Sequence, residues 1–440
     1  MTEENKFPTL EKCHKALENI EPRKWCGYVS KVVGLLLEAE LPGAMVGELC
    51  TVVTNRGVEK LAEVVGFRDD ICLLLLLVEG AGVNQGCKIY PSGKALQVGV
   101  GEELLGRVVN AIGEPMDNKP KPDYEEFRPL ENRAPDSYGR PRIKEVLPTG
   151  VKAIDGLLTL GIGQRIGLFA GTGVGKSTLM GMISRYSEAD VNVIALVGER
   201  GREVQDFIEV SLGEEGVKRS VCVIATGDEP AMMRLKCLLT ATTIAEYFRD
   251  KGKKVLLMVD SVTRMAMAAR DVGLAVGEPP TMKGYTPSVF SLIPRVLERA
   301  GKSKEGSITA IYNVLVEGDD MNEPISDTVR GVLDGHIVLS RKIAAKNHYP
   351  SIDVLNSVSR LFPEITNEEH QQIAGALRNS MAVYSENEDL VNIGAYESGT
   401  NPEVDMAIQL KPRIDEFLKQ GIFDTSDYDE TLAKFKEVFV

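Results

Sequence analysis

The sequence predicts an α/β fold in which a parallel β-sheet stands between a small β-rich domain and a helical domain. After about residue 150, near-continuous apolar segments alternate with helical patterns, as expected for strands buried on both faces of a sheet. Short β-rich runs with glycine-containing turns precede this region, and helical patterns follow Pro363. A chain of 440 residues has room for about two to four such domains.

Residues 1–24 are predicted to contain a helix that ends before Pro22. Its apolar residues recur at helical spacing and form a thin stripe: Phe7, Leu10, Leu17 and Ile20. Two interpretations stay open, since such a helix either packs on its own domain or docks a partner protein. The opening MTEENKFPTLEK has no basic region followed by an apolar one, so no secretory signal peptide is expected.

Residues 25–95 carry the β-rich runs YVSKVVGLLLEAEL, ELCTVVT and ICLLLLLVEG, separated by turns that contain glycine. Several short strands at this spacing predict a small barrel or a sandwich. The most apolar run, ICLLLLLV, is far shorter than the roughly 20 residues that span a bilayer. It is therefore interpreted as a buried strand.

Residues 96–363 contain the predicted parallel sheet, and residues 364–440 the predicted helices. The strand candidates are RIGLFA (165–170), VNVIALV (191–197), SVCVIAT (220–226), KKVLLMVD (253–260), GSITAIYNVL (306–315) and GHIVLS (335–340). In the helical region, Thr366 and Glu369 have the spacing of a capping box. DMAIQLKPRIDEFLKQG and YDETLAKFKEVFV read as further helices.

Composition excludes several classes of protein. A net charge of −13 opposes broad attraction to nucleic acid or to anionic lipid. The seven cysteines include no C-x-x-C pair, which opposes a disulfide framework or a structural zinc site and fits a reducing cytoplasm.

The segment FAGTGVGKST, from Phe169 to Thr178, is almost the phosphate-binding loop G-x-x-x-x-G-K-[ST]. Ala170 stands where the first glycine is expected, which is tolerable if its φ is negative. The segment follows an apolar strand and opens a helical pattern, and this is the context that the motif requires. The predicted nucleotide contacts are Ala170, Gly171, Thr172, Gly173, Val174, Gly175, Lys176, Ser177 and Thr178.

Glycines in such a loop let backbone N–H groups turn toward phosphates, and the helix N-terminus adds its positive end. Lys176 would reach the β- and γ-phosphates, and Ser177 would hold Mg²⁺. The predicted ligands are therefore ATP and Mg²⁺.

Two acidic residues follow other strands of the predicted sheet. Glu199, in GERGREV, comes directly after VIALV and would face the ligand crevice, where it could polarise an attacking water. Arg200 beside it could meet the γ-phosphate, although taken alone the cluster also suits a solvated surface. Asp260 ends VLLMVD, a Walker-B pattern that helps to hold Mg²⁺. Arg264 and the nearby Arg270 could each stabilise phosphate charge, but the favoured interpretation is that they form salt bridges on a helix surface.

Taken together, these segments resemble the type III secretion ATPases, which are relatives of the rotary ATP synthase β subunit. The resemblance runs from about Gly27 to the C-terminus. Besides AGTGVGKS and GERGREV, it rests on MVDSVTRMAMAARDVGLAVGEPP, GYTPSVFSLIPRVLERAG, VLVEGDDMNEPISDTVRGVLDGHIVLSR and YPSIDVLNSVSR. That family has alanine or glycine at the position of Ala170.

The resemblance implies an N-terminal β-barrel (25–95), a RecA-like P-loop NTPase domain (96–363) and a helical C-terminal domain (364–440). It implies a ring, usually a homohexamer, with ATP between subunits. Lys176 and Ser177 take the phosphate-loop roles, Glu199 activates water, Arg200 contacts the γ-phosphate and Asp260 is the Walker-B residue. Tyr349, in YPSID, would stack on adenine, and Arg360, in SVSR, would act as an arginine finger in a neighbour's site; local pattern assigns neither.

The segments VRGVLDGHIVLSR and EDLVNIGAYESG are similar to those of the flagellum-specific ATPase, so Mg²⁺-dependent ATP hydrolysis that energises flagellar protein export is expected. The alternative is the ATPase of a virulence-type secretion system. The resemblance also implies a stator-like regulator bound to residues 1–24, a central stalk-like protein, and an export gate with chaperones and exported flagellar proteins. The protein would be cytoplasmic and peripheral at the cytoplasmic face of the apparatus.

Three rival interpretations are weaker. One is a subunit of a rotary ATP synthase or vacuolar-type ATPase, but non-catalytic members lack the water-activating carboxylate that Glu199 provides, and the segments LERAG and VLVEGDDMNEP also favour secretion ATPases. Another is a catalytically dead ring subunit, which would not be expected to keep Lys176, Glu199, Asp260 and Arg360 together. An RNA translocase resembling the terminator Rho needs a basic, aromatic RNA-binding barrel. Residues 25–95 have few clustered Lys or Arg, although they include the aromatic residues Trp25, Tyr28, Phe67 and Tyr90.

Overall fold

The computed structural model describes residues 25–136, 138–316, 318 and 320–439. The helix expected within residues 1–24 therefore lies outside the described residues. The chain divides into two compact units, one ending at Ala95 and the other beginning at Leu96.

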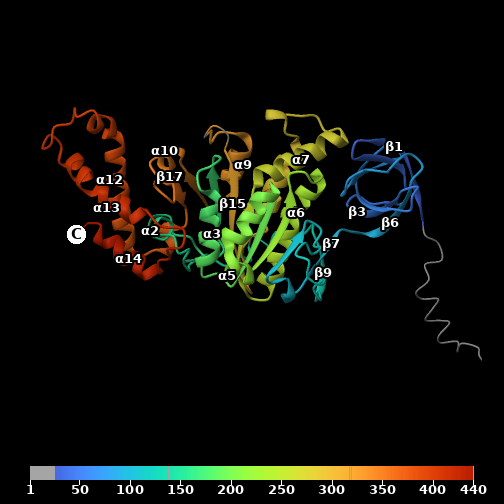
Figure 1. The fold of residues 1–440 in the computed structure, drawn as a ribbon, viewed down its shortest axis with the longest axis horizontal. Helices are drawn as coiled ribbons and strands as arrows, with labels where there is room; N and C mark the ends of the chain where they lie inside the picture. Colours follow the sequence, from blue (N-terminus) through green and yellow to red (C-terminus); the bar gives the residue numbers. More distant parts are fainter. Residues whose placement is uncertain (1–24, 137, 317, 319, 440) are drawn as a thin grey trace, which may run out of the picture. The chain divides into compact units, whose positions relative to one another are not determined.

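The first unit is a closed antiparallel barrel with the strand order β1-β2-β5-β4-β3-β6 (Figure 1). The prediction of a barrel or sandwich thus resolves to a barrel, in which closure leaves no free sheet edge. The leucine-rich run forms β5, and all but its first residue are buried in the barrel. The strands are β1 (Gly27–Val33), β2 (Leu36–Glu40), β3 (Glu48–Val53), β4 (Glu59–Arg68), β5 (Ile71–Leu76) and β6 (Lys88–Ala95).

Within the described residues, the second unit is built on a nine-stranded sheet with the order β17-β16-β10-β15-β13-β11-β12-β8, and β14 beside β15. Neighbours along this path are parallel except β17, which runs antiparallel to β16. The strands are β8 (Arg107–Asn110), β10 (Arg165–Ala170), β11 (Val191–Glu199), β12 (Ser220–Thr226), β13 (Lys254–Asp260), β14 (Gly301–Lys302), β15 (Ser307–Leu315), β16 (Gly335–Leu339) and β17 (Ile352–Ser359).

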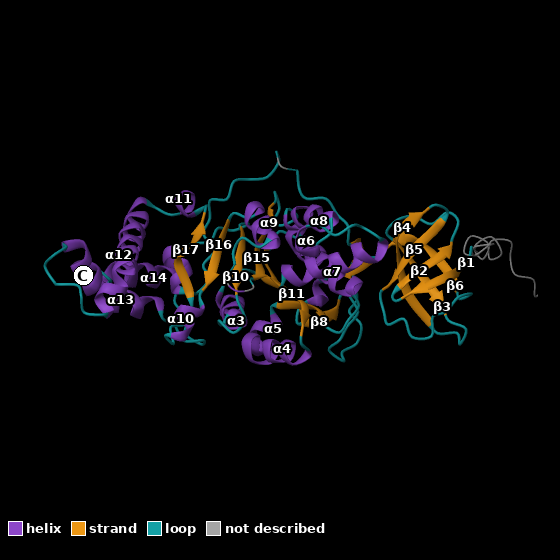
Figure 2. Ribbon diagram, turned by 90° about the horizontal axis from the view of Figure 1, so that it is seen from above, coloured by secondary structure: helices purple, strands orange, loops and turns teal. Residues whose placement is uncertain are grey.

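Helices cover both faces of this sheet, as Figure 2 shows, so the predicted α/β class with a buried parallel sheet is confirmed. One face carries α6 (Ala231–Asp250), α7 (Val262–Val276), α8 (Pro287–Leu297) and α9 (Pro324–Val332). The other carries α3 (Lys176–Tyr186), α4 (Gly201–Asp206), the π-helical η2 (Phe207–Leu212) and α5 (Gly213–Lys218). The remaining elements are η1 (Glu102–Leu104), η3 (Met282–Gly284), α2 (Lys152–Leu157), α10 (Arg341–Ala345), and a separate pair, β7 (Gln97–Val100) with β9 (Glu126–Pro129).

The six strand candidates of the core coincide with β10, β11, β12, β13, β15 and β16. Three strands of this sheet were not predicted, namely the two-residue β14 and the strands β8 and β17. β8 has only four residues, and β17 is a half-exposed edge strand in which polar and apolar residues mix. Neither shows the continuous apolar run by which a central strand is recognised.

The C-terminal part is helical, as predicted, with α11 (Phe362–Ile365), α12 (Glu368–Asn392), α13 (Pro402–Leu418) and α14 (Tyr428–Glu437). The capping box was wrong by one residue. Asn367 caps α12 by accepting from His370 N at 2.8 Å, whereas the Thr366 hydroxyl donates to Phe362 O and ends α11. Buried residues of these helices, among them Leu377 and Phe417, belong to the same hydrophobic core as the parallel sheet. In addition, His370 Nε2 lies 2.7 Å from Gly156 O.

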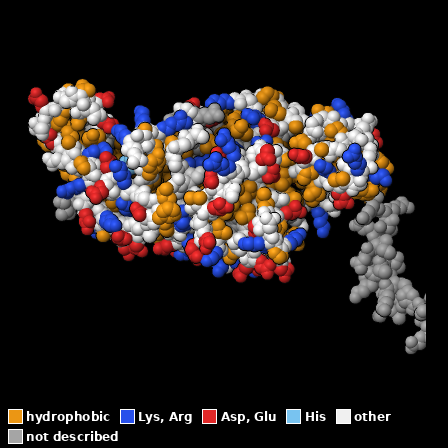
Figure 3. Space-filling model, viewed as in Figure 1, with side chains coloured by type: hydrophobic (Ala, Val, Ile, Leu, Met, Phe, Trp, Pro, Cys, Tyr) orange, Lys and Arg blue, Asp and Glu red, His pale blue; other side chains and the backbone are white. Residues whose placement is uncertain are grey.

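None of the helices in the described ranges is long and apolar enough to cross a bilayer. On the face seen in Figure 3, basic and acidic side chains are interspersed rather than gathered into one basic field. All six described cysteines are free thiols.

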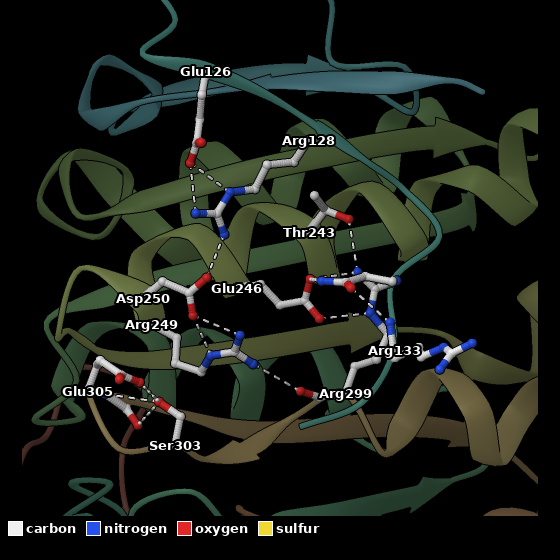
Figure 4. Close-up of polar contacts among 12 residues, drawn as sticks. Glu126, Arg128, Arg133, Thr243, Glu246, Arg249, Asp250, Arg299, Ser303 and Glu305 are labelled. Atoms are coloured by element: carbon white, nitrogen blue, oxygen red, sulfur yellow. Dashed lines mark hydrogen bonds and ion pairs between the residues drawn. The ribbon is translucent and has the colours of Figure 1, made fainter. Parts of the chain in front are cut away.

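A buried ion pair joins α6 to the segment that follows α8 (Figure 4). The side chains of Arg299 and Glu246 are only 2% and 1% exposed. Arg299 Nε and Nη2 donate to the two carboxylate oxygens of Glu246, each at 2.8 Å. The guanidinium also donates to Thr243 Oγ1 at 3.0 Å and to Leu130 O at 2.7 Å. Both buried charges are thus compensated, as such pairs require.

Removing one member of this pair is expected to destabilise the chain strongly. Glu246→Ala would leave the guanidinium buried without a counter-charge, at a cost of about 3–5 kcal/mol. Urea denaturation of the full chain measures this loss. The exposed pair Glu215–Lys218 is the matched control, and Glu215→Ala should cost less than about 1 kcal/mol. Equal effects of the two substitutions would contradict the expectation.

Candidate functional site

The glycine-rich segment lies between the end of β10 and the start of α3. Ala170 is the last residue of β10 and pairs with Leu315 on β15 and Leu339 on β16. Its backbone is therefore extended, which explains how alanine can stand at the first motif position. Gly173 and Gly175 have φ of 78° and 91°, a conformation that only glycine adopts readily.

The structure brings three of the predicted site residues together. Lys176 Nζ lies 2.7 Å from Asp260 Oδ1 and 3.4 Å from Glu199 Oε1. The two carboxylates end β13 and β11, and the carboxyl ends of parallel strands meet at one edge of the sheet. Both are almost buried, with side chains 4% and 8% exposed.

Two further residues belong to this cluster. Arg264 Nη1 lies 2.8 Å from Glu199 Oε2 and donates to Gly198 O at 2.5 Å. Asn313 Nδ2, on β15, donates to Asp260 Oδ1 at 2.7 Å. Arg264 and Asn313 thus fix one carboxylate each.

The interpretation of Arg264 as a surface residue was wrong, because its side chain points inward to Glu199 and is only 26% exposed. The sequence feature that could have indicated this position is that Arg264 lies one helical turn beyond Asp260, in a helix capped by Ser261. For Asn313 the signal was an amide inside an otherwise apolar strand. Arg270, by contrast, pairs with its neighbour Asp271 at 3.2 Å, as expected for a helix-surface ion pair.

Glu199 has an unusual protonation equilibrium. Burial raises its pKa to about 7, and a hydrogen bond with Glu203 and the negative charge of Asp260 act in the same direction. Lys176 and Arg264 oppose this rise. The shared hydrogen bond lowers the pKa of Glu203. A carboxylate that titrates near neutrality is suited to handling a proton at the site.

Arg200 and Tyr349 occupy different positions relative to the loop. Arg200 is the N-cap residue of α4; its side chain is 84% exposed and its Nη1 lies 3.8 Å from Glu203 Oε1, outside the buried cluster. The Tyr349 ring lies against the loop, since a Cβ placed on Gly175 would be 3.4 Å from two ring carbons. Ser351 Oγ donates to Val174 O at 2.6 Å and ties the Tyr349 segment to the loop.

Arg360 lies at the other end of the sheet. It follows the antiparallel strand β17, in which Ser359 pairs with Gly335, at the amino end of β16. This level corresponds to the start of β10 at Arg165, whereas the loop follows its end at Ala170. About 16 Å of strand separates the two levels, at roughly 3.3 Å per residue. Arg360, which is exposed, therefore lies at the end of the sheet opposite the loop of its own chain.

The donor set fits a magnesium ion bound with a nucleotide. Ser177 is exposed in the first turn of α3, and Asp260 already uses Oδ1 for Lys176 and Asn313, which leaves Oδ2 for a ligand. Among the described residues, no three His, Cys, Asp or Glu side chains group to hold a metal by themselves. Mg²⁺ keeps waters and phosphate oxygens as ligands, so one or two protein oxygens suffice.

Three family models match successive parts of the chain. Residues 29–93 match the β-barrel domain of the ATP synthase alpha/beta family, and residues 150–359 match its nucleotide-binding domain. Residues 366–437 match the C-terminal domain of the type III secretion ATPase EscN. The predicted combination of an N-terminal barrel, a P-loop NTPase core and a helical C-terminal domain is thereby confirmed.

Individual relatives match over nearly their full length. The chain is 52% identical to the flagellum-specific ATP synthase of Bacillus subtilis, with 95% of this chain and 96% of the relative covered. It is 49% identical to the type 3 secretion system ATPase of Xanthomonas euvesicatoria, with 94% and 93% covered.

A solved structure agrees with these matches. The assembled ATPase EscN of the enteropathogenic E. coli type III secretion system superposes with a TM-score of 0.90 at 46% identity, covering 94% of this chain and 100% of that one. EscN has also been solved in complex with its central stalk EscO. By sequence, domain order and fold, this chain belongs to the ATP synthase alpha/beta family, in the branch of flagellum-specific ATP synthases and type III secretion ATPases.

Proposed function

We propose that this chain hydrolyses ATP with Mg²⁺ to energise protein export by the flagellar type III apparatus, through release of chaperones, unfolding or delivery of substrates to the export gate. The observation that carries the proposal is the buried Glu199 held beside Lys176 and Asp260 at the phosphate loop. ATP is the substrate that this family of ATPases uses. The alternative system is virulence-type, whose ATPases share the same site.

Binding of the nucleotide would use the loop from Ala170 to Thr178. Its backbone N–H groups and the N-terminus of α3 would hold the phosphates, and Lys176 would turn from the two carboxylates to the β- and γ-phosphates. Ser177 and Asp260 would hold Mg²⁺, which when bound supplies positive charge beside the phosphates. Tyr349 would stack on adenine, since the residue is 41% exposed and its ring already borders the loop.

Hydrolysis would proceed by in-line attack of a water that Glu199 orients toward the γ-phosphate. Arg264 would keep Glu199 in place, as it does here at 2.8 Å. Charge that develops on the γ-phosphate would be stabilised by Lys176, by Arg200 after it turns inward from its exposed position, and by Arg360 of a neighbouring subunit.

The role of Arg360 requires an assembly, because it lies at the end of the sheet opposite its own loop. We therefore propose a ring, most simply a homohexamer, with ATP between subunits; the assembled state of EscN supports this. By the same comparison a stalk-like protein would engage the ring. Residues 1–24 would bind a stator-like regulator, and the ring would stand at the cytoplasmic face of the export gate, where chaperones and exported flagellar proteins arrive.

We propose domain boundaries at residues 1–24, 25–95, 96–363 and 364–440. They are supported by the end of the barrel strand β6 at Ala95 and by the short helix α11, which leads from the sheet into the long C-terminal helices. Nucleic acid is not an expected partner of any of these domains.

The test of this function uses the source organism. Glu199→Gln at the native locus should abolish the release of flagellin and hook protein into the medium, with other secreted proteins unchanged. Immunoblots of cells and medium quantify the loss. Normal release of flagellin, with loss of a different group of secreted proteins, would assign the protein to a non-flagellar secretion system. Unchanged release of all secreted proteins would reject a role in export.

The protonation state of Glu199 makes a separate prediction. Because burial raises its pKa to about 7, and the ionised form orients water, kcat/KM for ATP should fall as the pH drops through about 7. Glu203→Gln removes the carboxyl that shares a hydrogen bond with Glu199, so this acidic limb should move to lower pH. Steady-state rates from pH 5 to 9 check both. Glu209→Gln, farther along the same segment, is the control and should leave the profile in place.

A further inference from the structure

We infer that Gln164, Arg165, Asp334 and Ser359 form a seat that positions Arg360 for the active site of the neighbouring subunit. We call these four residues the finger seat. The inference rests on the proposed function, in which Arg360 completes a neighbour's site, and it adds four positioning residues that do not touch the nucleotide.

The seat holds the backbone of Arg360 directly. Arg360 N donates to Asp334 O at 3.0 Å. Gln164 Nε2 donates to the same carbonyl at 3.2 Å and to Ser359 Oγ at 3.0 Å, while Ser359 Oγ donates to Thr159 O at 2.9 Å. Gln164 and Ser359 are 0% and 4% exposed, so these contacts are shielded from water. Arg360 and the residue before it are therefore fixed by one buried amide.

An ion pair fixes the seat to the central strand β10. The Asp334 carboxylate accepts from Arg165 N at 3.0 Å, from Nε at 3.2 Å and from Nη2 at 3.3 Å. The remaining Arg165 nitrogen, Nη1, lies 2.5 Å from Glu298 Oε2. Paired contacts between a guanidinium and a carboxylate fix orientation as well as distance. The turn before β16 that carries Asp334 is thereby held in register with the start of β10.

The seat leaves the side chain of Arg360 unused. Within the described part of the chain, no acidic side chain pairs with its guanidinium, and the residue is exposed. An arginine with a purely structural role would donate its hydrogen bonds to nearby groups of its own chain, as Arg299 and Arg165 do. Holding the backbone while leaving the guanidinium available suits a group that must reach another chain. Misplacement by about 1 Å can cost 10²-fold in rate, so such a group needs a firm base.

The first test measures steady-state hydrolysis by the full chain under ring-forming conditions. Asp334→Asn keeps the size of the side chain but removes the charge that holds Arg165. We expect kcat to fall roughly 10- to 100-fold with the KM for ATP and ring assembly little changed, because the seat affects only the transition state. Glu145→Gln is the control, since it removes the ion pair with Lys302 at 2.9 Å, which does not touch the seat. A kcat of Asp334→Asn equal to that of the control would overturn the inference.

The decisive test mixes subunits. Glu199→Gln subunits have a disabled site and an intact finger, whereas Asp334→Asn subunits have an intact site and a weakened finger. In mixed rings some Asp334→Asn sites receive an intact finger, so activity per Asp334→Asn subunit should rise above that of the pure variant. A purely structural defect in the Asp334→Asn subunit would not be repaired by its neighbour.

A mixture of Arg360→Ala and Glu199→Gln subunits serves as the reference. It separates the proposal that Arg360 acts in a neighbour's site from the inference that the finger seat positions it. If mixing rescues both Arg360→Ala and Asp334→Asn, the finger seat is supported. If it rescues Arg360→Ala alone, the seat is rejected and the finger in trans stands. If it rescues neither, the finger assignment itself fails and the seat fails with it.

A second variant covers the case in which Asp334→Asn subunits do not assemble. Ser359→Ala keeps every charge and deletes one hydroxyl that Gln164 and Thr159 contact. Its loss of kcat should be several-fold, and it should be rescued by Glu199→Gln subunits in the same way. Absence of that rescue, with Arg360→Ala rescued in parallel, would again reject the seat.

Discussion

Replacing Glu199 by Gln is expected to lower the rate of ATP hydrolysis roughly 10²- to 10⁴-fold, the range that general base catalysis contributes. Glutamine keeps the length of the side chain, but its neutral amide cannot accept a proton from the attacking water. ATP binding should persist, because Lys176 retains Asp260 at 2.7 Å and the loop glycines are unaffected. Single-turnover hydrolysis and equilibrium binding of a fluorescent ATP analogue measure the two effects separately.

Glu203→Gln is the matched control for this substitution. It makes the same chemical change four residues away, in a carboxyl that shares a hydrogen bond with Glu199 but is not the proposed base. At pH 8 and above, where Glu199 is ionised in either protein, the control should hydrolyse ATP at a nearly normal rate. Turnover that survives in Glu199→Gln would remove the assignment of this residue.

Replacing Arg360 by Ala is expected to cost roughly 10³- to 10⁵-fold in kcat, as for other arginine fingers supplied in trans. The affinity of an isolated subunit for ATP should change little, because Arg360 lies at the end of the sheet opposite its own loop. The wild-type protein should show a related effect. Its rate of ATP hydrolysis should rise faster than linearly with protein concentration while rings assemble, because an isolated subunit would lack the arginine that the proposal assigns to its neighbour.

Titration of the enzyme across the range from monomer to ring, with the assembly state measured by analytical ultracentrifugation, checks this expectation. Arg413→Ala is the control, since it removes an exposed arginine from α13. It should leave both the rate and its concentration dependence unchanged. Strict proportionality of wild-type rate to concentration across that range would contradict a finger in trans.

Structural elements that a short stretch of sequence identifies by itself could be predicted. The phosphate loop needs only its own residues, a preceding strand and a following helix, and the central strands show continuous apolar runs because both faces are covered. Glu199 and Asp260 could likewise be placed at one edge of the sheet, because each follows an apolar strand and the carboxyl ends of parallel strands lie at the same edge. The structure adds that Ala170 is extended, which explains its presence in the loop.

Elements that depend on chain topology could not be predicted in this way. The contact between Tyr349 and Gly175 joins residues far apart in sequence, and it arises because β16 lies beside β10. The position of Arg360 depends on β17 reversing direction, and a half-exposed edge strand carries little periodic signal. Arg264 was misjudged because an arginine on a helix is usually solvated, and only the geometry shows that it reaches Glu199.

The strand β10 has a consequence for how subunits would communicate. The strand β10 runs from Arg165, which belongs to the finger seat, to Ala170, where the phosphate loop begins, and it is paired with β15 on one side and β16 on the other. Backbone hydrogen bonds on both sides make this strand a stiff connection between the two regions. If Arg360 acts in a neighbour's site as proposed, a change at a subunit's own phosphate loop would be transmitted through β10 to the arginine that reaches the next subunit. Each chain would report its state to only one neighbour, so the signal would travel around the ring in a single direction.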